Sequence, residues 1–245
     1  MTRTRATALH LAICVIIAGV LWAYFQYVIY PAPLFQAVGG DKIFLMLLGI
    51  DVVLGPLLTF IVFKQGKRTL KFDLSVIAFV QICALAYGVQ ALYAGRPVFL
   101  AALGHRFDAV QASDVAEENI IASGRSLPKF GPELTGIKIP EDKKIRNQVM
   151  DTSLFAGQDY GHYPQYHAKL ESMRDEILSR SQPISELKTY NPGREGEIDE
   201  WLSSRKLKPI DVKFQALKAR AKDMTVMISA QDGSVIELAD FTPWK

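Results

Sequence analysis

The chain has 245 residues, 28 lysines and arginines, 25 aspartates and glutamates, and a formal net charge of +3. The charges are unevenly distributed, because residues 1–97 contain eight basic and three acidic residues, whereas residues 98–245 contain twenty basic and twenty-two acidic residues. Mixed charges of this kind form no basic stripe in the second part, which argues against nucleic-acid binding.

Three apolar segments, at about residues 8–30, 42–63 and 74–93, have the length that a helix needs to cross the hydrocarbon core of a membrane, which is about 20 residues. A cleaved signal peptide is the alternative for the first segment. Its apolar part would be only about 7–15 residues, and no small-x-small cleavage site follows. Residues 1–97 are therefore predicted to form a membrane domain of three transmembrane helices.

The positions of lysine and arginine predict the orientation of these helices. Arg3 and Arg5 precede the first helix, and four basic residues fill the turn at residues 64–71, whereas the turn at residues 31–41 contains none. Basic residues near helix ends stay preferentially in the cytoplasm. The sequence thus predicts an inner-membrane protein with a cytoplasmic N-terminus and a periplasmic C-terminal domain.

Residues 98–245 are predicted to form one extracytoplasmic α+β domain with a small antiparallel sheet. An Asp232-Gly233 turn between two apolar runs is typical of a β-hairpin. The order of elements, two strands, a helical middle and three strands, matches PAS and Cache-like sensor domains. We expect strands at about residues 98–103, 106–110, 212–217, 224–230 and 234–239, helices starting near residue 114 and at about 141–155, 165–181 and 195–206, and a Pro/Gly-rich loop at 126–140.

Asp51 is the most informative single residue, because an acid in the middle of a membrane helix costs a few kcal/mol and normally faces a partner or a cavity. Since no second acid lies within the predicted spans, packing or partner binding is favoured over a proton or ion pathway. In the third segment, Gln81 and Gly88 share one helical stripe, which suits close contact with a helix of the same unit or of a partner.

The segment 159–167 concentrates His, Tyr and Asp, residue types that are common in catalytic and metal-binding sites. However, His162 and His167 are five residues apart with Pro164 between them, whereas metal-binding histidines on one helix are usually four apart. An aromatic surface loop is therefore favoured. The sequence contains no nucleophile elbow, phosphate loop or dinucleotide fingerprint, and the soluble part has no cysteine. We predict no catalytic residue, no metal, no cofactor and no enzymatic activity.

Several motifs carry a resemblance to a known family. They are Gly49-Ile50-Asp51-Val52-Val53-Leu54-Gly55-Pro56-Leu57-Leu58-Thr59, Phe63, Asp73-Leu74, Gln81, Leu85, Tyr87-Gly88, Arg96-Pro97, Lys222-Asp223-Met224-Thr225, Asp232-Gly233 and Pro243-Trp244. With these residues the sequence resembles the TfpX/TfpZ-type type IV pilin accessory proteins, while residues 112–210 add no motif. The resemblance implies an inner-membrane, chaperone-like factor that promotes or modulates type IV pilus assembly, and it implies no catalytic residue.

The partners expected from this resemblance are a type IV pilin subunit and other pilus assembly proteins, together with the lipid bilayer. One hypothesis is that Asp51 meets the N-terminal amine of a pilin helix within the membrane, where an opposite charge is the least costly partner for a carboxylate. The partner-binding candidates are Asp51, Gly55, Pro56, Gln81 and Gly88, and the structural or interface candidates are Asp73, Tyr87, Arg96 and Pro97.

Two other functions stay open from the sequence. A membrane-anchored sensor would bind a small ligand in its extracytoplasmic domain and act through a membrane partner, and an enclosed pocket there would favour it. A flat exposed apolar face would favour the accessory function instead. A membrane transferase is the third possibility, but the outward turn at residues 31–41 has almost none of the polar residues that such an enzyme needs.

Overall fold

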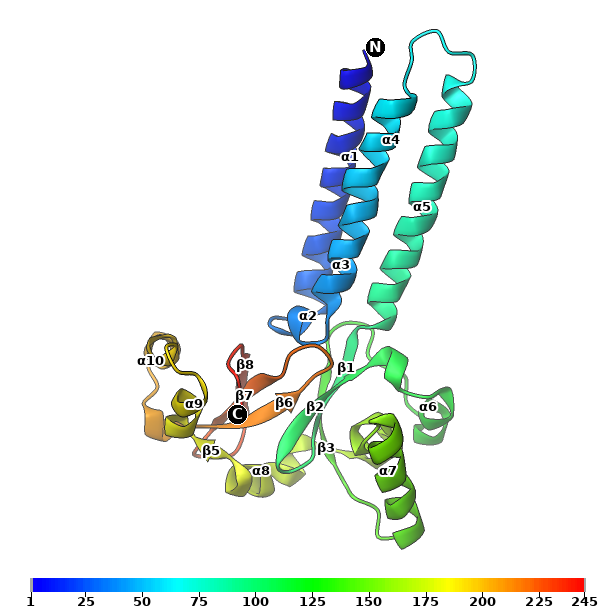
Figure 1. Cartoon of the computed structure of the whole chain (residues 1–245). Helices are drawn as coiled ribbons and strands as arrows, with labels where there is room; N and C mark the ends of the chain where they lie inside the picture. The colour runs from blue at the N-terminus through cyan, green and yellow to red at the C-terminus, as the bar shows by residue number, and fades with distance from the viewer. Residues whose placement is uncertain (1, 245) are drawn as a thin grey trace.

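The computed structural model describes residues 2–244, which form a layer of three long helices and a curled β-sheet with short helices around it (Figure 1). The first long helix consists of α1 (Arg3–Tyr24) and a π-helical extension, η1 (Phe25–Ile29). The second consists of α3 (Gly40–Leu48), a π-helical stretch, η2 (Gly49–Leu54), and α4 (Gly55–Val62), and the third is α5 (Leu70–Ala94). All three are long and apolar enough to cross a membrane, which confirms three apolar helices at the predicted positions.

The ends of these helices differ slightly from the prediction. Each helix begins a few residues earlier than its apolar segment and ends within one residue of it. The early starts include Arg3, Arg5 and Lys71, because a helix continues through basic residues whose long side chains carry the charge away from the apolar region. The second helix contacts both α1 and α5 and lies between them (Figure 1).

The sheet has eight strands in the order β4-β3-β1-β2-β6-β7-β8, and β5 pairs with β6 beside this path. The pairs β1–β3 and β2–β6 are parallel, and the other pairs are antiparallel. The strands are β1 (Pro97–Ala102), β2 (Arg106–Gln111), β3 (Glu133–Ile137), β4 (His167–Ala168), β5 (Gln182–Pro183), β6 (Val212–Lys218), β7 (Met224–Ser229) and β8 (Val235–Ala239).

The prediction of a small antiparallel sheet was therefore wrong, because the sheet is larger and mixed. The sequence analysis did not predict strand β3, because it lies inside the Pro/Gly-rich segment that we assigned to a loop. This strand is short and is held by pairing with β1 on one side and β4 on the other, so tertiary contacts override its weak local pattern. The similarity to PAS and Cache-like domains stays a prediction.

The helices of the domain agree with the prediction in part. They are α6 (Glu117–Ser123), α7 (Lys143–Ala156), α8 (Arg174–Arg180), α9 (Ile184–Tyr190) and α10 (Glu195–Ser204), with short 3₁₀ turns η3 (Ala112–Asp114), η4 (Tyr160–His162), η5 (Pro164–Tyr166), η6 (Leu170–Met173) and η7 (Pro209–Asp211). The helix expected at 165–181 is replaced by η5, β4, η6 and α8. Its first half leaves the helical path because β4 pairs with β3.

The turn between the first two long helices enters the core of the sheet. It contains the short helix α2 (Leu34–Ala37), and Leu34 and Ala37 are fully buried in one cluster with side chains of β1, β2, β6 and β7. The carbonyl oxygen of Ala37 accepts hydrogen bonds from the backbone N–H groups of Ala221 at 2.9 Å and Lys222 at 3.0 Å. The division at residue 97 thus stays a prediction, and the core of the sheet includes residues from before it.

We expect Leu34→Ala to destabilise the sheet although Leu34 lies in the turn between two membrane helices. Removing a fully buried leucine side chain leaves a cavity and costs about 2–5 kcal/mol of unfolding free energy. Urea unfolding of the detergent-solubilised chain, followed by tryptophan fluorescence, measures this change. Gln36→Ala in the same turn is the matched control, because Gln36 is exposed. Equal stability of the two variants would contradict the role of Leu34 in the core.

Candidate functional site

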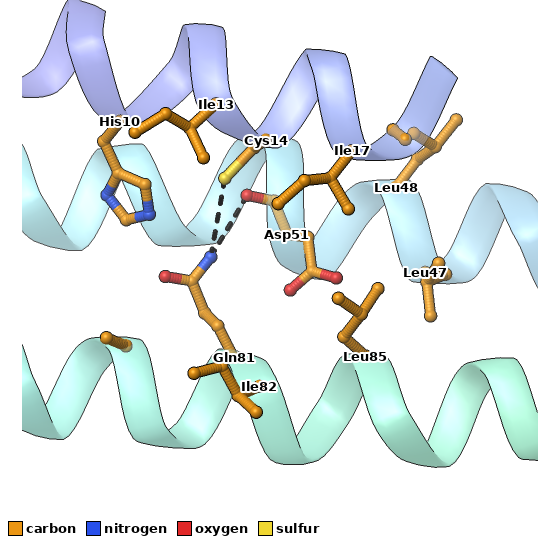
Figure 2. A pocket seen from close by; sticks show the side chains of 12 residues that line it. His10, Ile13, Cys14, Ile17, Leu47, Leu48, Asp51, Gln81, Ile82 and Leu85 are labelled. Atoms are coloured by element: carbon orange, nitrogen blue, oxygen red, sulfur yellow. Dashed lines mark hydrogen bonds between the residues drawn. The ribbon is translucent and has the colours of Figure 1, made fainter. Parts of the chain in front are cut away.

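The three long helices enclose a groove between α1, the second helix and α5 (Figure 2). Its volume is about 230 Å³, and its lining is almost entirely apolar. We call it the interhelical groove. Its lining residues are His10, Ile13, Cys14, Ile17, Ala18, Leu47, Leu48, Asp51, Ala78, Gln81, Ile82 and Leu85.

Asp51 provides the charged group of the interhelical groove. The residue is only 8% exposed, and among the described residues neither carboxylate oxygen has a hydrogen-bond partner. Figure 2 shows the carboxylate directed into the space between the second helix and α5. A buried carboxylate without donors is costly, so this position is suited to a donor or a cation that another molecule brings.

The backbone at Asp51 is π-helical, and Pro56 explains why. Proline has no N–H to donate to the carbonyl four residues before it, and its ring collides with that carbonyl in a regular α-helix. The wider turn of η2 (Gly49–Leu54) accommodates this defect immediately before Pro56. The motif at residues 49–59 therefore sets the direction of the Asp51 side chain.

Gln81 and Gly55 form the contact between the second helix and α5 beside Asp51. The Gln81 side-chain amide donates to the backbone carbonyl of Asp51 at 3.2 Å and lies 4.0 Å from the sulfur of Cys14. A Cβ atom on Gly55 would lie 1.9 Å from Nε2 of Gln81. This position therefore requires glycine, because the Gln81 amide occupies the space that a side chain would need.

Gly88 forms a second close contact, in which a Cβ atom would lie 1.9 Å from Cδ1 of Leu47. Gly88 on the stripe of the third helix therefore packs inside the three-helix unit, which is one of the two alternatives that the sequence left open. Of the five partner-binding candidates, only Asp51 and Gln81 line the interhelical groove, while Gly55, Pro56 and Gly88 are buried between helices.

His10 is a groove residue that the sequence analysis missed. Its Nδ1 lies 2.7 Å from Oγ1 of Thr59, so α1 and α4 share a polar contact within their apolar surfaces. We did not weigh this histidine, the one in the first apolar segment. An ionisable residue inside a membrane segment is itself a signal of function, and it would have identified His10.

Three of the four structural and interface candidates lie at the ends of α5, and Tyr87 lies within the helix. Asp73 forms an ion pair with Lys67 at 2.7 Å, which braces the basic turn, and Tyr87 is exposed on the outside of α5. Arg96 is buried where α5 meets the sheet, with its guanidinium 4.0 Å from the centre of the Tyr93 ring. Pro97 begins β1, so Arg96 and Pro97 form the junction between helix and sheet.

An apolar face on α7 is the second surface without a partner in the described part of the chain. Val149 is the buried residue of this helix, whereas Met150, Leu154 and Phe155 are exposed, and Phe155 is 89% exposed. Exposed large apolar side chains that lie near one another can mark a binding surface. We call these three residues the α7 face.

The segment 159–167 has a structural role. The Asp159 backbone N–H donates to the His162 ring at 3.1 Å, and the His167 ring bonds through Nε2 to the carbonyl oxygen of Gly161 at 3.0 Å. The edge of the His167 ring packs on Phe99 with a centroid distance of 4.5 Å. Across residues 2–244, no group of three or more His, Cys, Asp and Glu side chains is arranged to hold a metal ion.

Helices and groove together define the class: a protein with three helices able to cross a membrane, a curled mixed-sheet domain, and an acid-containing groove between the helices. Three curated relatives from Dichelobacter nodosus are similar to it. The fimbrial assembly protein of serogroup I is 27% identical over 187 residues, which cover 74% of this chain and 72% of the relative. The protein of serogroup E1 is 28% identical over 192 residues, with 75% and 74% covered.

The fimbrial assembly protein of serogroups C1 and C2 is 36% identical over 96 residues, which cover 38% of this chain and 73% of that relative. The chain therefore belongs to the fimbrial assembly protein family. No family model matches the chain, and no solved structure matches it. The narrower TfpX/TfpZ assignment stays a prediction.

We expect Gly55→Leu to separate the second helix from α5 and lower the melting temperature in detergent. Overpacking a tight contact costs about 1–3 kcal/mol, because Gln81 and the helices must move. Gly49→Leu is the matched control on the same helix, since a Cβ there meets nothing within 4 Å. If both leucine variants melt at the same temperature, the contact at Gly55 is not a tight one.

The stability of the soluble domain should fall in acid partly because of His167. Burial lowers the pKa of His167 below its ordinary value of 6.5. The unfolded chain therefore binds a proton at a pH where the folded chain does not, so the free energy of unfolding decreases as pH drops below about 6.5. His167→Gln should flatten this decrease between about pH 7.5 and about pH 5.5 in urea titrations. His105→Gln, at an exposed histidine, should leave it unchanged.

Proposed function

We propose that this protein is a non-enzymatic accessory factor of type IV pilus assembly that binds a pilin subunit in the inner membrane. The fimbrial assembly relatives support a role in building the fibre. The observation that carries the binding role is the interhelical groove with the unpaired carboxylate of Asp51. A groove of this kind suits an apolar helix that brings its own polar group.

The proposed topology places the N-terminus in the cytoplasm and the sheet in the periplasm. Arg3, Arg5 and the basic turn at residues 64–71 lie at the end of the helix layer that is opposite the sheet (Figure 1). The turn that contains α2 lies at the other end, against the sheet. Six basic residues lie at the end away from the sheet and two, Lys42 and Arg96, at the other, an excess that supports this orientation by the positive-inside tendency.

In the proposed complex, the pilin occupies the interhelical groove with its apolar helix. Such a subunit waits in the membrane as one apolar helix with an N-terminal amine and a glutamate near it, as the family resemblance implies. Asp51 lies eleven residues from the end of α4, which corresponds to a depth of about 16 Å at 1.5 Å per residue. An amine at this depth needs an opposite charge, and Asp51 supplies one without losing an existing hydrogen bond.

The outward domain supplies a second contact in this proposal. The α7 face exposes Met150, Leu154 and Phe155 without any covering residue in the described chain. An exposed apolar face of this kind is the feature that favours an accessory protein over a sensor. We propose that the α7 face holds the globular part of the pilin and limits its premature association.

A sensor function would use a different feature of the domain. A groove of about 1020 Å³ lies between β3, β4, η6 and the start of β8, and Arg125, His167 and Arg174 contribute to its lining. This groove is wide and open rather than enclosed, so it gives a small ligand less burial than a typical binding pocket. We therefore rank the sensor function second.

Site-specific photocrosslinking in the native membrane tests the proposal. Ile82 lines the interhelical groove, whereas Val80 on the same helix is exposed outside it and serves as the matched control. We expect a photoreactive residue at Ile82 to crosslink to pilin and one at Val80 to do so far less. Equal yields at both positions, or crosslinks only to a kinase or transporter, would overturn pilin binding in the groove.

Asp51→Asn tests the role of the charge with almost no change of shape. If the carboxylate pairs with an amine of the partner, we expect the crosslinking yield from Ile82 and the amount of surface pilus to fall by roughly tenfold, which corresponds to about 1.4 kcal/mol. The apolar surface of the groove is unchanged in this variant. Wild-type yields with Asp51→Asn would show that the groove binds without this ion pair.

A further inference from the structure

The loop between α6 and β3, residues 124–132, is fixed at the place where two long helices leave the helix layer. Nε of Arg96 donates to the carbonyl oxygen of Pro128 at 3.2 Å, and Arg96 follows the end of α5 by two residues. A Cβ atom on Gly131 would lie 3.8 Å from Cγ of Pro31, which follows the first long helix. The loop therefore lies level with the ends of both helices.

The loop turns one aromatic side chain outward at this level. Leu127 packs against the core cluster of Val98, Phe99 and Val110 and so anchors the loop to the sheet. Phe130, three residues later, is 64% exposed, and Lys129 beside it is exposed as well. Gly131 has a φ of +62°, a conformation that glycine adopts without strain, and this turn returns the chain to β3.

We propose that Lys129 and Phe130 contact the surface of the same bilayer that holds the three helices. Aromatic rings are favoured at the boundary between headgroups and hydrocarbon, and Tyr27 and Tyr93 are exposed at the ends of the first and third helices at this level. A lysine next to the ring can extend its ammonium group to lipid phosphates while its methylene chain stays in apolar surroundings.

The bilayer is the occupant that the geometry supports, because the loop is tethered within contact distance of residues that directly follow a membrane helix. An exposed phenylalanine farther from the helices could be covered only by a separate binding partner. Phe130, in contrast, lies next to the ends of the helices, where lipid is adjacent. The contact gives the periplasmic domain an attachment to the membrane besides its covalent links to the helices, and it is independent of pilin binding.

Ile139 provides a matched control site in the same part of the chain. It follows the end of β3, and β3 runs parallel to β1, which begins at Pro97 beside α5. Ile139 therefore lies at the end of the sheet that is away from the helices, and at 54% exposed it resembles Phe130 in accessibility. Phe79 on α5, which is 68% exposed, serves as a reference for direct contact with lipid.

The test is spin-label accessibility of the full chain in liposomes. Nitroxides are placed by Phe130→Cys, Ile139→Cys and Phe79→Cys, each in a background with Cys14→Ala and Cys83→Ala, and collision rates with oxygen and with a neutral nickel chelate are compared. We expect the ratio of oxygen to nickel collisions at position 130 to be several-fold higher than at position 139 and to approach the value at position 79. All three sites are exposed, so the labels leave the core unchanged.

A ratio at position 130 no higher than at position 139 would overturn the proposal. A label at position 130 that is immobile and shielded from both reagents would overturn it too, and would show that a protein surface covers Phe130 instead. Because the liposomes contain no pilin, either result leaves the proposed function untouched.

Discussion

The structure depends on the joint at which the turn between the first two long helices packs into the core of the sheet. Leu34 and Ala37 complete the main core cluster, and the carbonyl of Ala37 is satisfied by the backbone at Ala221 and Lys222. Gln111 adds a side-chain bond from β2 to the carbonyl of Gly95 at 2.6 Å. Since buried backbone groups must find partners, these bonds fix one end of the helix layer against the sheet.

The joint fixes one end of the helix layer, and close contacts fix the rest. Gly55 and Gly88 bring α5 close to the second helix, while Thr59 holds α1 through His10. The interhelical groove is thus lined by helices that are already held together, and its charged group does not depend on a partner to be positioned. Binding a partner helix would then require little ordering of this chain, which reduces the entropic cost of association.

The sequence predicted those features that depend on residues close together along the chain. Apolar segment length predicted three helices, and an acid in one of them predicted a polar point in an apolar surrounding. The parallel pairs of the sheet could not be predicted, because β1–β3 and β2–β6 join segments whose relative position depends on packing. Helix α2 is short and its segment has no periodicity, so only its burial reveals its role. His10 could have been found, since its signal was a histidine in an apolar run.

The pairing of residues 37 and 221 also determines the order in which the protein can become complete. Synthesis makes the turn with Leu34 early, but its partners in β6 and β7 come almost last, and contacts of such long sequence separation form slowly. Until then the core around Leu34 and Ala37 lacks the side chains of β6 and β7. A chain that stops before β7 keeps its three long helices yet exposes an unfinished sheet, so truncated and finished copies differ in the apolar surface that they expose.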